Sequence, residues 1–257
     1  MGENVRAASA LICEAAAGGA RFIATPENTT LMAPDAGAKL AASYPERDDP
    51  ALPVFAGLAA ELGVYLLIGS IAIKVSETKT ANRSILFTPD GRIGARYDKI
   101  HLFDVTLGGG EAYAESNTVA GGRQAILAPT PWGKVGMSVC YDVRFPQLYQ
   151  RLALAGAFAF TVPSAFTVPT GEAHWHGLLR ARAIENGAFV IAPAQGGLHA
   201  NGRKTYGHSL IISPWGEVLA EAGTDPGVIY ADIDPAASAA ARVKLPNLQH
   251  GRDFEGP

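Results

Sequence analysis

A four-residue turn with proline in second place and glycine in fourth place occurs three times in this chain. The three turns are Thr88–Gly91, Thr130–Gly133 and Ser213–Gly216, and each lies between two runs of apolar residues. Proline presets the backbone for the second position of a tight turn, and glycine tolerates the dihedral angles at its end. The pattern therefore predicts three antiparallel β-hairpins. Because helical patterns lie between the hairpins, we expect a mixed α/β fold.

The spacing of apolar residues predicts the other elements. Helices are expected at residues 4–17, 53–62, from 145 onward, 171–186 and 235–242. Strands are expected at residues 22–25, 64–73, 83–87, 92–97, 135–139, 158–162, 189–194 and 228–233. No linker, charge block or low-complexity stretch interrupts this order, so one domain over residues 1–257 is expected.

Composition excludes several classes of protein. The 257 residues carry a formal net charge of −3, which gives no bias toward nucleic acid or an anionic membrane. The apolar stretch 53–73 contains Glu61 and Gly63 and is interpreted as a helix followed by a strand, not as a membrane span. The two cysteines, Cys13 and Cys140, provide neither a disulfide framework nor zinc-site spacing. With no secretory signal at its beginning, the chain is expected in the cytoplasm.

Cys140 lies where an apolar strand gives way to a helical pattern. In an open α/β sheet, strand ends of this kind usually carry the chemistry. A helix N-terminus beside a thiol also favours the thiolate, which is the nucleophilic form. The alternative is a small buried hydrophobic residue without a catalytic role, which is the commoner fate of a single cysteine.

Glu27 and Lys99 occupy the same kind of position as Cys140, directly after an apolar strand. Together the three side chains predict an amide-cleaving site. Cys140 would attack a carbonyl carbon, Glu27 would transfer protons, and Lys99 would stabilise the oxyanion. Taken singly, Glu27 is equally compatible with a loop cap, and Lys99 with a solvated pair with Asp98 or Asp104.

Three stretches in this order resemble the nitrilase superfamily of carbon–nitrogen hydrolases. They are Thr25–Asn28, Tyr97–Asp104 and Val139–Pro146. The resemblance covers nearly the whole chain. It implies an α/β fold of the α-β-β-α sandwich type, a Glu-Lys-Cys triad, no metal or organic cofactor, and a homodimer as the minimal assembly.

The same resemblance assigns a second carboxylate and a substrate class. It places the family's second glutamate at Glu115, where it would position Lys99 and the substrate amide. The stretches Gly108–Glu111, Val168–His176 and Tyr206–Ser209 are similar to amidases that hydrolyse deaminated glutathione. The alternatives are an ω-amidase acting on 2-oxoglutaramate, a carbamoylase or nitrilase of the superfamily, and a non-catalytic binding protein on this fold.

Four further residues are predicted to contact the substrate. The backbone N–H of Tyr141 would assist Lys99 at the oxyanion. Arg144 would clamp a substrate carboxylate, or instead pair with Asp142 or Glu172. Two residues of the loop expected after strand 158–162 would form pocket walls. They are Phe166 and Thr170.

Two histidines close in sequence, His174 and His176, suggest a metal site at first sight. Residues two apart point to different faces of a helix, so no shared ion is expected.

The chain differs from the family in one respect, because it opens on a helix where the family has a strand. Either the true start lies upstream or this version lacks that strand. We predict that the outer edge of strand 22–25 is unpaired, which would loosen the attachment of Glu27.

Overall fold

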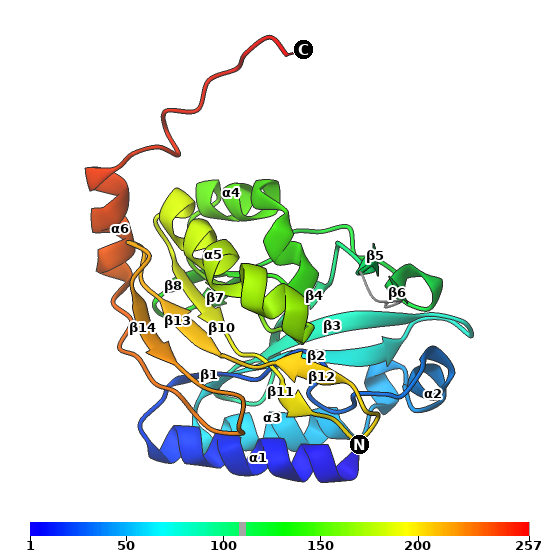
Figure 1. Cartoon of the computed structure of the whole chain (residues 1–257). Coiled ribbons are helices and arrows are strands. Elements are labelled where there is room, and N and C mark those ends of the chain that lie inside the picture. The colour runs from blue at the N-terminus through cyan, green and yellow to red at the C-terminus, as the bar shows by residue number, and fades with distance from the viewer. Residues whose placement is uncertain (108–111, 257) are drawn as a thin grey trace.

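The computed structural model describes residues 1–107 and 112–256 (Figure 1). The stretch Gly108–Glu111, on which part of the resemblance rests, lies outside the described residues.

Two β-sheets form the middle of the molecule. The first has the strand order β1 (Phe22–Ala24), β2 (Tyr65–Lys74), β3 (Thr80–Phe87) and β4 (Ile93–Asp98). The second has the order β14 (Val218–Glu221), β13 (Leu210–Ile212), β10 (Phe189–Ala192), β9 (Ala157–Thr161), β8 (Gly133–Met137) and β7 (Leu127–Thr130). Parallel and antiparallel pairs occur in both sheets, as expected of a mixed α/β fold.

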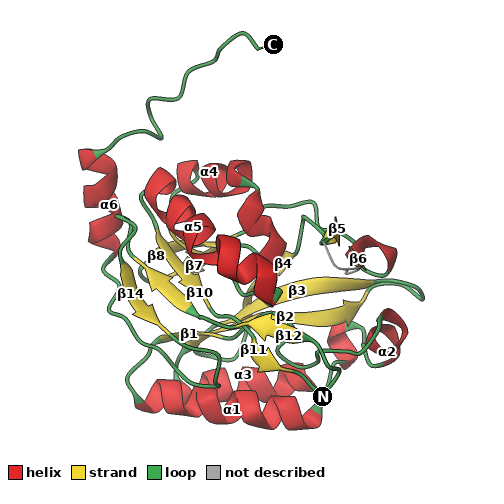
Figure 2. Cartoon of the chain, in the orientation of Figure 1, coloured by secondary structure: helices red, strands yellow, loops and turns green. Residues whose placement is uncertain are grey.

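Helices cover the outer face of each sheet. α1 (Gly2–Ala17) and α3 (Ala51–Leu62) pack together below the first sheet, and α4 (Pro146–Leu154) and α5 (Val168–Asn186) lie above the second (Figure 2). α6 (Pro235–Lys244) contacts the second sheet at β9. The layers are helix, sheet, sheet, helix, and the predicted α-β-β-α sandwich is confirmed.

Alternation along β2 explains the layers. Leu66 and Ile68 belong to the apolar cluster beneath α1 and α3, whereas Leu67 between them belongs to the cluster shared with the second sheet. Successive side chains of a strand point to opposite faces, so a strand buried on both sides reads as a continuous apolar run. The run at residues 64–73 therefore marks a strand sandwiched between two cores.

The three predicted hairpins are confirmed. β3 and β4, β7 and β8, and β13 and β14 are antiparallel pairs joined at the three proline–glycine turns. Two other predictions were wrong. Thr170 lies in the first turn of α5 and not in the preceding loop, because Pro169 suits a first helical turn. Residues 228–233 form no strand, because no described strand is hydrogen-bonded to them in a ladder.

The outer edge of β1 is unpaired among the described residues, as predicted. β1 pairs with β2 through the register Phe22–Tyr65 to Ala24–Leu67, and it ends the strand order of its sheet. The expectation that this would loosen Glu27 was wrong, because Glu27 is buried and anchored from the β2 side.

Short elements surround the edge where the two sheets meet. They are α2 (Ala36–Ala41), β5 (Asp104–Thr106), β6 (Ala112–Ala114), β11 (Gly196–Leu198), β12 (Lys204–Tyr206) and the 3-10 helices η1 (Glu46–Asp48), η3 (Glu115–Asn117) and η4 (Cys140–Arg144). Over the described part of the chain, no helix has the length and apolarity needed to cross a bilayer.

Candidate active site

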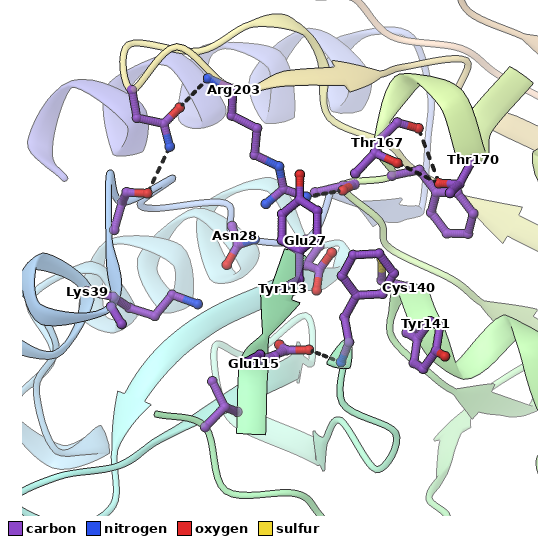
Figure 3. Close-up of a pocket in the computed structure, with 18 of the residues that line it drawn as sticks. Glu27, Asn28, Lys39, Tyr113, Glu115, Cys140, Tyr141, Thr167, Thr170 and Arg203 are labelled. Carbon is purple, nitrogen blue, oxygen red and sulfur yellow. Dashed lines mark hydrogen bonds between the residues drawn. The ribbon is translucent and has the colours of Figure 1, made fainter. Parts of the chain in front are cut away.

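Glu27, Lys99 and Cys140 converge on one cavity of about 830 Å³, together with Glu115 (Figure 3). Glu27 follows β1, Lys99 follows β4, and Cys140 begins η4 after β8. Thus one sheet supplies the carboxylate and the ammonium, and the other supplies the thiol.

Cys140 has a left-handed backbone with φ of 51°. A non-glycine residue in this region costs about 1–2 kcal/mol, so the surrounding contacts must enforce it. The Cys140 N–H donates to the carbonyl of Pro163 at 2.9 Å. This turn directs the thiol into the cavity while the backbone stays bonded to the loop after β9.

Asp142 fixes the turn from inside. The Asp142 side chain has no exposed surface and accepts hydrogen bonds from Tyr97 Oη at 2.7 Å, Val139 N at 2.9 Å and His101 N at 3.0 Å. Tyr97 and His101 belong to the segment that carries Lys99, so Asp142 ties the thiol turn to the lysine strand. From the sequence, Asp142 was expected only as a partner of Arg144.

Lys99 is 2% exposed and lies between two carboxylates. Its Nζ is 3.2 Å from Glu27 Oε1 and 2.8 Å from Glu115 Oε2. Burial alone would lower the pKa of Lys99, but the charges of Glu115 and Glu27 outweigh it and raise that pKa well above its usual value. Lys99 is therefore a permanent cation here, and the alternative of a surface pair was wrong.

Asn82 of β3 bridges the same two carboxylates. Its Nδ2 donates to Glu27 Oε1 at 2.9 Å and to Glu115 Oε1 at 3.2 Å. Asn82 was not identified from the sequence, because the strand was expected to begin at Arg83. An asparagine within an otherwise buried strand would have been the signal for a functional side chain. Both donors to Glu27 use Oε1, which leaves Oε2 for the thiol of Cys140.

The loop carrying Glu27 is bonded to a bulge in β2. Gly69 N donates to Thr25 Oγ1 at 3.0 Å, and Asn28 N donates to Ser70 Oγ at 2.9 Å. A Cβ on Gly69 would overlap the carbonyl oxygens of Thr25 and Pro26, so glycine is needed for this close approach.

The thiol of Cys140 is protonated at rest. Burial raises its pKa, and the negative charge of Glu27 raises it further, while Lys99 offsets only part of this. The expected tendency of a helix N-terminus to favour the thiolate is outweighed here by burial and by the charge of Glu27. The arrangement requires a base beside the thiol during attack, and Glu27 is the carboxylate in that place.

The four residues predicted to contact the substrate all line the cavity. They are Tyr141, Arg144, Phe166 and Thr170. The Arg144 guanidinium lies over the rings of Tyr141 and Phe166 at 5.9 and 5.4 Å. Its Nη2 is 3.3 Å from His174 Nδ1, and it pairs with no carboxylate of the described residues. The alternative pairing with Asp142 or Glu172 was thus wrong.

Three cavity cations, Lys39, Arg203 and the adjacent Lys204, were not identified from the sequence. Lys39 of α2 and Arg203 of the β11–β12 hairpin extend into the cavity (Figure 3). None of the three follows an apolar strand, so the pattern that identified Lys99 gave no signal for them.

The histidines lie apart, as expected. His174 contacts Arg144, whereas His176 and His208 both contact Glu221 Oε1, at 3.0 and 2.9 Å. The hydrogen bonds from His208 and His176 outweigh burial and lower the pKa of Glu221. This cluster bonds α5 to β14 on the outer side of the second sheet.

Fold and cavity together define a class of protein, an α-β-β-α sandwich enzyme with a buried cysteine at the meeting edge of its sheets. A family model described as carbon–nitrogen hydrolase matches residues 2–243. The chain belongs to the carbon–nitrogen hydrolase family.

Curated relatives bear amidase names. The chain is 41% identical over 255 residues to the deaminated glutathione amidase of Mus musculus, with 97% of this chain and 79% of the relative covered. It is 40% identical over 253 residues to the protein of that name from a Synechocystis strain, with 96% and 92% covered. The human omega-amidase is 36% identical, with 97% and 90% covered. The chain is thus an enzyme of the amidase kind.

Solved structures agree with the fold. The NitFhit protein of C. elegans superposes with a TM-score of 0.90 at 33% identity, with 97% of this chain and 61% of that chain covered. A mutant amidase from Nesterenkonia superposes with a TM-score of 0.82 at 25% identity, with 97% and 88% covered. In that amidase the acetamide moiety of fluoroacetamide is covalently attached to the active-site cysteine.

Proposed function

We propose that this enzyme hydrolyses the linear amide bond of a small carboxylate-bearing amide through a thioester on Cys140. The observation that carries the proposal is the contact set around Lys99. It places Glu27 Oε1 at 3.2 Å and Glu115 Oε2 at 2.8 Å from one buried ammonium, beside a protonated thiol.

Acylation begins when Glu27 takes the thiol proton as Sγ attacks the amide carbon. The oxyanion forms beside the Lys99 ammonium and the backbone N–H of Tyr141, whose fixed charge and dipole stabilise it. Glu27 then gives its proton to the amide nitrogen, the C–N bond breaks, and the amine leaves.

Deacylation uses the same groups with water as nucleophile. Glu27 takes a proton from water, hydroxide adds to the thioester carbon, the C–S bond breaks, and Glu27 gives its proton to the departing sulfur. The products are the carboxylic acid and the restored thiol. No step needs a metal or organic cofactor.

Glu115 and Asn82 act as positioning residues in this scheme. The hydrogen bonds that Glu115 and Asn82 make hold Lys99 and Glu27 in a fixed arrangement. Glu115 also accepts from Phe103 N at 2.7 Å, which fastens this carboxylate to the segment after Lys99.

The proposed substrate is deaminated glutathione. Arg144 offers its guanidinium to the cavity without a carboxylate partner among the described residues, which favours a carboxylate-bearing amide. Phe166 and Thr170 would form the wall beside it. The relatives named deaminated glutathione amidase support this choice of substrate. The second candidate, 2-oxoglutaramate, is favoured by the human omega-amidase.

The test is release of 2-oxoglutarate, the acid product common to both substrates, by the intact chain and by Cys140→Ala. Loss of the nucleophile should reduce turnover by at least about 10³-fold while the far-ultraviolet circular dichroism is unchanged. Cys13→Ala is the matched control, since this exposed thiol lies on α1, and it should keep full activity. Turnover of nitriles or carbamoyl amino acids alone would overturn the amidase assignment, and turnover of no substrate would favour a binding protein.

The proposal also includes the oligomeric state and the cellular location of the enzyme. A homodimer in the cytoplasm is expected, and sedimentation equilibrium of the purified chain tests the dimer. A monomer at all concentrations would contradict it.

A further inference from the structure

We propose that Lys39 and Arg203 form a second carboxylate-binding site, which accepts a carboxylate carried by the leaving amine. The inference rests on the proposed function and deepens it. It assigns the enzyme to amides that carry a carboxylate at both ends, one on the acyl side at Arg144 and one on the amine side.

Arg203 is held with its guanidinium in the cavity. Its Nη2 donates to the carbonyl of Ala165 at 2.7 Å, and the guanidinium lies over the Tyr113 ring at 5.7 Å. Its Nε is buried and has no hydrogen-bond partner among the described residues. An unpaired buried donor of this kind is costly, so the other contacts of Arg203 must hold the side chain at the cavity wall.

Lys39 reaches the same wall from α2. Asn201 joins the two segments, because its Nδ2 donates to Ala33 O at 2.8 Å and its Oδ1 accepts from Arg203 N at 3.0 Å. Within the described residues Lys39 has no ion-pair partner within 4.0 Å. Burial lowers the pKa of Lys39, and the negative charges of Glu115 and Glu27 oppose this.

The formal charge of the cavity wall fits a dianion. Among the described lining residues there are five cations, Lys39, Lys99, Arg144, Arg203 and Lys204, and three carboxylates, Glu27, Asp35 and Glu115. The difference is five minus three, or +2. An amide with two carboxylates would neutralise this excess, whereas an amide with one would leave a positive charge uncompensated.

Glu27 determines which end of the substrate faces Lys39 and Arg203. The leaving nitrogen must face Glu27 to receive its proton, and Lys39 is close enough for the Glu27 charge to affect its pKa. Figure 3 shows Lys39 and Arg203 on the opposite side of Cys140 from Tyr141, the residue over which Arg144 lies. The substituent of the leaving amine therefore extends toward Lys39 and Arg203.

Two substrates with one acyl group and different leaving groups test the site. Deaminated glutathione releases cysteinylglycine, which bears a carboxylate, whereas 2-oxoglutaramate releases ammonia. Lys39→Met and Arg203→Met should each lower kcat/KM for deaminated glutathione by about 10- to 100-fold, mainly through KM. The same variants should change kcat/KM for 2-oxoglutaramate less than about threefold.

Changing the substrate provides the complementary measurement. Replacing the glycine carboxylate of deaminated glutathione by a carboxamide should lower kcat/KM of the wild type by about 10- to 100-fold. In Lys39→Met, which already lacks the charge that binds this carboxylate, the same replacement should lower kcat/KM only slightly. Lys244→Met, an exposed lysine in the last turn of α6, is the control and should behave as wild type. Arg203→Lys should restore part of the loss of Arg203→Met, because it keeps the charge.

The outcomes separate this site from the proposed function. Wild-type turnover of neither substrate would overturn the proposed function. If the wild type hydrolyses deaminated glutathione but the variants lose both substrates equally, or lose neither, the function stands and the second carboxylate site is refuted.

Discussion

A single ammonium, that of Lys99, lies between two buried carboxylates and contacts both. Two adjacent carboxylates repel each other, and the Lys99 ammonium between them offsets this repulsion. The charge of Lys99 lowers the pKa of Glu115 although burial opposes this, and a hydrogen bond from Phe103 N adds to the effect. The Cys140 thiol shows the opposite shift, because burial and the charge of Glu27 raise its pKa and favour the neutral form. At the residue scale the site is an ion-pair network with one transferable proton.

Glu115 should make stability depend on pH in a defined direction. A carboxylate whose pKa is lowered by folding stabilises the protein above the unfolded value of 4.5, and this contribution is lost as the pH falls through the folded value. Glu115→Gln should lower the free energy of unfolding by about 3–5 kcal/mol at neutral pH. The difference from wild type, measured by urea unfolding, should shrink below pH 4.5. A difference that grows on acidification would contradict the ion-pair assignment.

The elements that carry this network were largely predictable from sequence. Alternating and continuous apolar runs marked the strands, and the proline–glycine turns marked all three hairpins, because both signals are local. Residues 228–233 read as a strand from apolar content alone, but a strand also needs a hydrogen-bonded neighbour. Asn82, Lys39 and Arg203 were missed because their roles arise from contacts between distant segments.

Gly69 is the point where β2 determines the position of Glu27. Gly69→Ala should push away the loop at Thr25 and Pro26, and lower the free energy of unfolding by about 1–3 kcal/mol. Because small displacements of a catalytic group are costly, kcat/KM should fall by about 10²-fold.

Gly57→Ala on α3 is the matched control. Beyond the neighbouring backbone of α3 itself, no atom of the described residues lies within 4 Å of the added methyl group, so stability should rise by about 0.5–1 kcal/mol with unchanged activity. Wild-type kcat/KM in Gly69→Ala would show that the β2 bulge does not position Glu27.

Across the whole molecule, two sheets each contribute part of the site. The first sheet carries Glu27 and Lys99, the second carries Cys140, and Asp142 joins them through Tyr97 and His101. The α-β-β-α sandwich brings the strand ends together, with a thiol, a carboxylate and an ammonium in one cavity. If Cys140 is the nucleophile of this cavity, every substrate with the same acyl group must pass through one thioester.

Hydroxylamine partitioning tests that requirement most directly. Deaminated glutathione and 2-oxoglutaramate would form the same thioester on Cys140, so hydroxylamine should capture the same fraction of each as hydroxamate at a given concentration. We expect one ratio of hydroxamate to 2-oxoglutarate for both substrates, and no hydroxamate with Cys140→Ala. Different ratios for the two substrates, or hydrolysis without hydroxamate, would contradict a common thioester intermediate on Cys140.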